Sequence, residues 1–355
     1  MSDTYSKFVP NKKCKRTMTY PQKYYAKKAF SRFFLGYVLM YLVSELFAAV
    51  LVYGIKKIIP LIPSNTAVPL VNFINEYYII TFAIYGFMYF IAFPFILCRM
   101  VKGLPSWDKR CDGMPGGRIV GFFFILQFSN IILANIGVAV EDFIAGLLGV
   151  STEPLFSDIP LWVLSILALV IAPIFEELIF RKVLMDKIGV YGERLAIIVS
   201  ALSFGAFHGN FQQFFFTTVA GLALAIIYAK TKKIIFPIIL HFINNSYGVF
   251  QQFVYEIEGL SEEVYEGLSY ADLYLVSIAY LFAVIGLVFL FIAMFRGWFG
   301  VKNSPDTVYI TQKRGRIMFF NIGVLSFSCY IIYTFMTSFL PIRDWLNLIK
   351  GLLNL

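Results

Sequence analysis

The sequence PLWVLSILALVIAPIFEELIFR occupies residues 160–181, and it contains no charged side chain before Glu176. At 1.5 Å per residue, about 20 helical residues cross the ~30 Å hydrocarbon core of a membrane. This stretch therefore predicts a transmembrane helix that carries three charged residues, Glu176, Glu177 and Arg181, toward one end.

The whole chain has the composition of a membrane protein. Of its 355 residues, 59% are hydrophobic and 14% are charged, and the mean hydropathy is +0.75, whereas soluble domains carry roughly a quarter charged residues. Further apolar runs predict an all-α integral membrane protein, a polytopic bundle of about nine (eight to nine) transmembrane helices. The predicted spans are 33–55, 77–98, 119–140, 160–180, 195–212, 214–229, 234–253, 273–295 and 317–340.

The basic residues predict the orientation of these spans. The formal net charge is +9, and most of the 30 Lys and Arg residues fall in alternate connecting segments. Such alternation follows the positive-inside rule, which places Lys-rich and Arg-rich segments in the cytoplasm. We therefore expect a multi-pass protein of the cell membrane with a cytoplasmic N-terminus and an external C-terminus, and no nucleic-acid partner.

The chain has no internal repeat, so we expect a basic cytoplasmic arm, residues 1–32, followed by a single membrane domain, residues 33–355. The arm interleaves Lys and Arg with Tyr20, Tyr24, Tyr25 and Phe30. This pattern is typical of a segment that binds anionic lipid. The alternative is that the arm serves only as a topology signal. The oligomeric state is not predicted.

Ionisable side chains inside spans are costly and often functional. Here they are Glu45, Glu176, Glu177, Arg181, His208 and His241, and the chain has only these two histidines. Glu177 and Arg181 are spaced i,i+4, so they can pair on one helix face. Glu176 is rotated by about 100° and lacks that partner. In the alternative interpretation, both glutamates share Arg181 as a structural triad.

Two later helices contribute further polar residues. Phe204 and His208 are spaced i,i+4, with Gly205 between them allowing close approach of another helix. His241 and Asn245 have the same spacing, and Asn244 is a second amide that could substitute for Asn245. The three helices can converge at mid-membrane depth only if the first one extends to about Ile188.

The converging donors suit a divalent metal ion. One carboxylate with two imidazoles is a known catalytic zinc set, so Glu176, His208 and His241 are candidate ligands for Zn. The spacing is not H-E-x-x-H, which excludes the common zincin helix. The alternative is that each buried histidine is an ordinary core residue with its hydrogen bonds satisfied.

Three motifs, Glu176-Glu177-x-x-x-Arg181, Phe204-x-x-x-His208 and His241-x-x-x-Asn245, resemble the signature motifs of the CPBP intramembrane protease family. This family groups type II CAAX prenyl endopeptidases with bacteriocin-processing and self-immunity proteins of the ABI type. The resemblance covers residues 160–255, which would form a four-helix protease-like core.

The resemblance implies an intramembrane endopeptidase that acts on a membrane-associated or secreted-peptide precursor. Glu176 and His208 would activate water, while His241 and Asn245 would stabilise the oxyanion or complete a metal site. The supporting residues would be Glu177, Arg181, Phe204 and Asn244. Two alternatives stay open, a non-catalytic membrane scaffold or bacteriocin-immunity protein of the same fold, and a transporter, since buried charges also mark ion paths.

Overall fold

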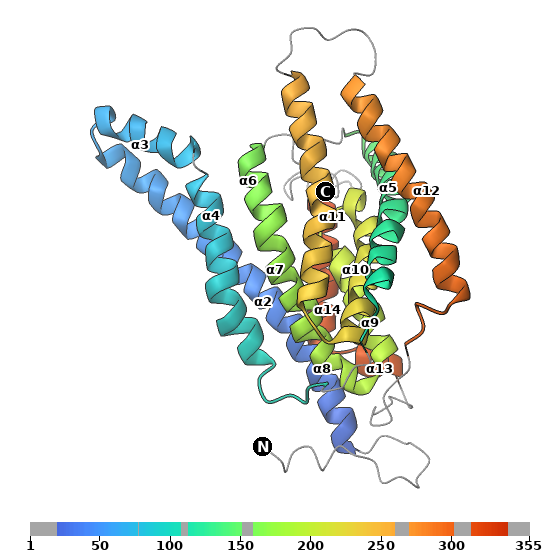
Figure 1. Ribbon diagram of the computed structural model, residues 1–355. Helices are drawn as coiled ribbons and strands as arrows, with labels where there is room; N and C mark the ends of the chain where they lie inside the picture. Colours follow the sequence, from blue (N-terminus) through green and yellow to red (C-terminus); the bar gives the residue numbers. More distant parts are fainter. Residues whose placement is uncertain are drawn as a thin grey trace. The chain divides into compact units, whose positions relative to one another are not determined.

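The computed structural model describes residues 20–76, 78–107, 113–150, 159–259, 270–301 and 314–339. Every regular element in these ranges is a helix (Figure 1). Helices form because a backbone in hydrocarbon must satisfy its N–H and C=O groups internally. The predicted all-α polytopic membrane fold is confirmed.

Six helical stretches of the described residues are long and apolar enough to cross a membrane. They are Lys23–Leu61, Ile79–Cys98, Gly116–Leu148, Leu161–Tyr191, Phe211–Thr231 and Val276–Phe295. The other three predicted spans coincide with α9 (Glu193–Phe207), α11 (Ile235–Gly259) and α14 (Ile322–Thr337). The count of nine spans and the orientation of the termini therefore stay predictions.

The chain divides into two compact units. Unit 1 comprises Met1–Pro105 and Ile310–Tyr330, and unit 2 comprises Ser106–Tyr309 and Ile331–Leu355. The predicted division into an arm, a single membrane domain and a core at 160–255 stays a prediction. Every residue of the three motifs lies in unit 2.

Unit 1 is built around the long helix α2 (Tyr20–Ile58). It also contains η1 (Ile59–Leu61), α3 (Ser64–Glu76), α4 (Ile79–Gly86), η2 (Phe87–Cys98) and α13 (Arg314–Met318). Helix α2 begins inside the predicted arm, and Phe30 is buried there. Residues 1–19 of the arm lie outside the described residues, so its contact with anionic lipid stays a prediction.

Unit 2 contains one continuous helical stretch from Leu161 to Tyr191. Its segments are α6 (Leu161–Ser165), η3 (Ile166–Ile171), α7 (Ala172–Glu177), η4 (Leu178–Met185), α8 (Asp186–Ile188) and η5 (Gly189–Tyr191), of which η3 and η4 are π-helical. The stretch passes Ile188, so the extension that the sequence requires for a common site is confirmed.

A tight helical hairpin lies beside this stretch. Helix α9 leads through the turn 208–210 into α10 (Phe211–Thr231), and α10 packs against both α9 and α5 (Gly116–Leu148). A Cβ atom at Gly205 would lie 1.9 Å from Thr218 Oγ1, so only glycine permits this contact. The close approach predicted at Gly205 is confirmed. Helix α12 (Tyr270–Phe295) packs on α5.

The far end of the hairpin is fixed by Asp186. Its carboxylate pairs with Lys182 Nζ at 3.1 Å and Lys232 Nζ at 2.7 Å, and it accepts a hydrogen bond from Tyr228 Oη at 2.9 Å. Lys232 also donates to the Trp107 carbonyl oxygen at 2.9 Å and lies over the Trp107 ring. These contacts join the end of α10 to the helix that carries Glu176.

Candidate active site

The paired glutamates of α7 have different surroundings. Glu177 forms an ion pair with Arg181, with 3.0 Å between Oε2 and Nε, and both side chains are fully buried. Arg181 also donates to the Gly221 carbonyl oxygen at 3.3 Å and lies 4.5 Å from the centre of the Phe204 ring. The predicted i,i+4 pair of Glu177 and Arg181 is therefore present, and its contacts lead into α9 and α10.

His241 of α11 lies between the two glutamates. Its Nδ1 is 3.0 Å from Glu177 Oε1, and its Nε2 is 3.9 Å from Glu176 Oε2. An ionised carboxylate only accepts hydrogen bonds, so Nδ1 of the neutral ring carries the proton and Nε2 is left as an acceptor. The 3.9 Å separation exceeds a hydrogen bond. His241 is thus oriented by Glu177 and faces Glu176.

Glu176 is the member of the pair without a close cation. It is 6% exposed, and its Oε2 has no hydrogen-bond partner among the described residues. A buried polar atom with no partner costs roughly 1–3 kcal/mol. A buried carboxylate oxygen without a hydrogen bond, next to an imidazole acceptor, is typical of a group that binds or activates another molecule.

His208 ends α9 at the turn of the hairpin. Its Nδ1 lies 2.9 Å from the Phe204 carbonyl oxygen, so Nδ1–H donates and Nε2 is again the free acceptor of the neutral ring. The Phe204 ring contacts both imidazoles edge-on, at 5.2 Å from His208 and 5.6 Å from His241 between ring centres. The Phe204 ring therefore packs against both histidines and restricts their orientation.

The neighbouring amides of α11 make different contacts. Asn245 donates from Nδ2 to the Ala168 carbonyl oxygen at 2.8 Å, toward the helix that carries Glu176. Asn244 Oδ1 accepts from Gln127 Nε2 at 3.2 Å and from Asn130 Nδ2 at 2.9 Å, both on α5. Asn244 is thus held away from Asn245, and we now expect that it cannot replace that residue.

The candidate zinc ligands do not gather into one site in this structure. Within the described ranges, no group of three His, Cys, Asp or Glu residues could hold a metal ion. Glu176 Oε2 and His241 Nε2 lie 3.9 Å apart, which two ligands of one ion can do, but the structure does not bring His208 to them as a third ligand. We therefore assign no chemical step to a metal, and the three-ligand zinc site stays a prediction.

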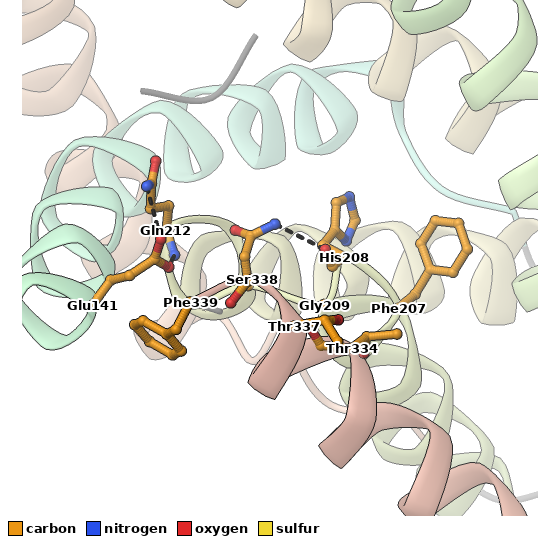
Figure 2. Close-up of a pocket in the computed structure, with 10 residues that line it drawn as sticks. Glu141, Phe207, His208, Gly209, Gln212, Thr334, Thr337, Ser338 and Phe339 are labelled. Carbon is orange, nitrogen blue, oxygen red and sulfur yellow. Dashed lines mark hydrogen bonds between the residues drawn. The ribbon is translucent and has the colours of Figure 1, made fainter. Parts of the chain in front are cut away.

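A cavity of about 500 Å³ lies next to the turn that carries His208 (Figure 2). Seven of its ten lining residues have polar side chains, and the others are two phenylalanines and a glycine. The lining residues are Glu141, Phe207, His208, Gly209, Asn210, Gln212, Thr334, Thr337, Ser338 and Phe339.

Glu141 is a buried carboxylate that the sequence analysis missed. The predicted third span ended at residue 140, whereas α5 continues to Leu148. The apolar residues Phe143, Ile144 and Leu147 after Glu141 were the signal that the helix goes on and that Glu141 lies within it. The remaining predicted site residues all lie in the region described above.

The helical membrane fold and the buried carboxylate–histidine site are both features expected of a membrane peptidase. Comparison with known proteins agrees. Residues 158–247 match the family model described as type II CAAX prenyl endopeptidase Rce1-like. YdiL of Bacillus subtilis, to which membrane peptidase activity is ascribed, is 33% identical over 178 residues, which cover 46% of this chain and 69% of YdiL.

The chain belongs to this Rce1-like family of membrane peptidases. A second relative, the membrane-embedded CAAX protease MroQ of Staphylococcus aureus, is 31% identical over 90 residues, which cover 23% of this chain and 36% of MroQ. No solved structure matches the chain. The resemblance predicted from the three motifs is confirmed, and all three motifs lie inside the matched range.

Proposed function

We propose that the protein is an intramembrane endopeptidase in which Glu176 acts as the base that activates water. The observation that carries the proposal is the contrast within the glutamate pair. Glu177 is neutralised by Arg181, whereas Glu176 Oε2 has no hydrogen-bond partner among the described residues and faces His241 Nε2 at 3.9 Å. A water molecule beside both atoms would meet two acceptors, which is the environment that deprotonation requires.

The other site residues take supporting roles in this proposal. Glu176 takes a proton from water as the oxygen attacks the peptide carbonyl carbon, and the proton then passes to the leaving amine. Asn245 uses one N–H on Ala168, so its second N–H is available for the oxyanion. His208 presents Nε2 as a further acceptor for the water or as a carrier of the proton.

For the substrate, we propose a membrane-associated or secreted-peptide precursor. Both named relatives are bacterial, and one carries the name of a CAAX protease. The peptide must reach a site buried between membrane helices, which favours a substrate that is itself apolar or held at the membrane. The masses of the product peptides would identify the bond that is cleaved.

Complementation of a deletion strain tests this function against a scaffold or immunity role. Glu176→Gln is nearly isosteric, so at matched membrane abundance it should fold and yet fail to complement, as should His208→Ala. Asp142→Asn alters an exposed carboxylate of α5 and should complement fully. Rescue by both site variants would rule out proteolysis as the function and favour the non-catalytic alternatives.

Zinc binding is a separate proposal with its own test. If Glu176, His208 and His241 hold zinc, elemental analysis should find about one ion per chain, and each of the three residues should be needed for it. Strong chelators should then abolish cleavage and added Zn²⁺ should restore it. Full cleavage by metal-free protein would reject the zinc site and leave activation of water to Glu176 and the histidines.

A further inference from the structure

We expect the turn between α9 and α10 to lie at membrane depth. Helix α9 has 15 residues, which span about 22 Å at 1.5 Å per residue, less than the ~30 Å hydrocarbon core. The chain then reverses at residues 208–210 and returns through α10. The first N–H groups of α10 have no partners within their own helix, and hydrocarbon offers them none.

Glu141 of α5 supplies those partners. Its Oε2 accepts hydrogen bonds from the backbone N–H of Phe211 at 2.9 Å and of Gln212 at 3.1 Å. Its Oε1 accepts from Gln212 Nε2 at 2.9 Å (Figure 2). The side chain is 4% exposed. A carboxylate at this end of a helix also complements the positive end of the helix dipole. The charge of Glu141 is therefore compensated by backbone and amide donors.

The same turn is tied to His208. Asn210 caps α10 by accepting from Gln213 N at 2.9 Å, and its Nδ2 donates to the His208 carbonyl oxygen at 2.8 Å. Gly209 adopts the left-handed conformation, with φ of 68°. The hydrogen bonds thus run from Glu141 to the start of α10 and from Asn210 back to the main chain of His208.

Close packing of α5 on the turn supports this linkage independently. Gly137 precedes Glu141 by four residues, so both lie on one face of α5. A Cβ atom at Gly137 would lie 2.3 Å from the Phe211 carbonyl oxygen. The backbone of the turn therefore packs directly on α5. Gly137 leaves space for it, and Glu141 binds it through hydrogen bonds.

We infer that Glu141 is a positioning residue, which holds the α9–α10 turn and thereby sets the place of the His208 imidazole. The effect on catalysis rests on the proposed function, but the effect on His208 does not. Both carboxylate oxygens are used, and their negative charge strengthens all three hydrogen bonds. A neutral amide would hold the two backbone N–H groups more weakly, even if the Gln212 side chain turns to accept from the new N–H₂ group. Glu141→Gln should therefore disturb the turn although its shape is almost unchanged.

The two histidines allow a direct measurement. Labelling with ¹⁵N-histidine gives two imidazoles, which His208→Ala assigns. In Glu141→Gln we expect a changed chemical shift for His208 and an unchanged one for His241, which lies on another helix. Asp142→Asn, at the next and exposed position, should change neither. Identical His208 signals in Glu141→Gln and the wild type would overturn the inference.

A charge swap separates positioning from general instability. In the double variant Glu141→Gln with Gln212→Glu, the new amide can donate to the new carboxylate while its carbonyl oxygen accepts the two backbone N–H groups. The His208 signals should return toward those of the wild type. If Glu141→Gln does not fold, Gln212→Ala removes one of the three hydrogen bonds, and a smaller shift of His208 is expected. An unchanged His208 in that variant would also overturn the inference.

Hydrolysis of a peptide that the wild type cleaves gives the second readout. Misplacement of a reacting group by about 1 Å can cost on the order of 10²-fold in rate, so Glu141→Gln should lower kcat by up to that factor with little change in KM. The double variant should recover kcat. If the wild type cleaves no peptide, the proposed function fails while the histidine spectra still decide the role of Glu141.

Discussion

Two buried carboxylates of unit 2, Glu177 and Glu141, are stabilised in different ways. Glu177 is held by side chains, the Arg181 cation at 3.0 Å and the His241 ring at 3.0 Å. Glu141 is held largely by the backbone, through the first N–H groups of α10. Each thereby fixes one histidine, Glu177 through a direct contact and Glu141 through the turn. Glu176 Oε2 has no hydrogen bond of either kind among the described residues, and on this difference rests the proposal that Glu176 is the reactive carboxylate.

The largest effect on stability is expected where a buried charge loses its partner. Arg181→Ala leaves the Glu177 charge without its cation and with only the His241 N–H, which should cost about 3–5 kcal/mol and reduce the yield of folded protein. The control is Lys182→Ala, because Lys182 is the next residue and is 58% exposed. Unfolding in denaturing detergent measures both. An Arg181→Ala protein as stable as the wild type but inactive would instead give Arg181 a direct role in substrate binding.

The two amides of α11, Asn245 and Asn244, are expected to differ in their effect on kcat. Removal of one oxyanion donor typically lowers kcat by about 10²–10³-fold, which is the loss expected for Asn245→Ala. Asn244→Ala removes contacts to Gln127 and Asn130 on α5, so it should lower stability but leave kcat within a few fold. Equal losses of kcat in both variants would show that neither amide has a specific role in the reaction.

The hairpin that carries His208 should be sensitive to added volume. Gly205→Ala forces a methyl group against Thr218 and the Phe214 carbonyl oxygen, and overpacking of this kind costs about 1–3 kcal/mol. Gly248→Ala is the control, since a Cβ atom there would meet nothing within 4 Å. If Gly205→Ala unfolds no earlier than the control, the hairpin is not as tightly packed as described.

The smallest effect on stability is expected at Asp186, a buried carboxylate that pairs with two lysines. Lys232 is 16% exposed and also bonds to Trp107, whereas Lys182 is 58% exposed. Lys232→Met should therefore cost about 1 kcal/mol, and Lys182→Met should cost less, as surface ion pairs do. The reverse order in a thermal unfolding series would mean that burial does not govern these ion pairs.

The comparison also explains what the sequence could predict. The i,i+4 pair of Glu177 and Arg181 is set by helix geometry within one stretch, so spacing alone was enough to predict it. Apolar run length predicted the membrane helices, and the three motifs predicted the family. These are local features, and they need no knowledge of how the helices pack.

Contacts between helices could not be predicted in the same way. Glu141 bonds to Phe211, which is 70 residues away, and Asn244 bonds to Gln127 across 117 residues. A hydropathy window also ends a span at the first charges, so Glu141 was left out of the buried set. The role of Glu141 could be recognised only once its partners on α10 were known.

The origin of the oxygen in the product tests the central claim most directly. Cells that make the wild type or Glu176→Gln at equal membrane abundance are converted to membranes and incubated in H₂¹⁸O, and the released peptides are analysed by mass spectrometry. We predict that the wild type yields new C-terminal carboxylates that carry ¹⁸O, and that Glu176→Gln lowers their rate of formation by about 10²–10⁴-fold. Equal rates of labelled product from both proteins would contradict the role of Glu176 as the base.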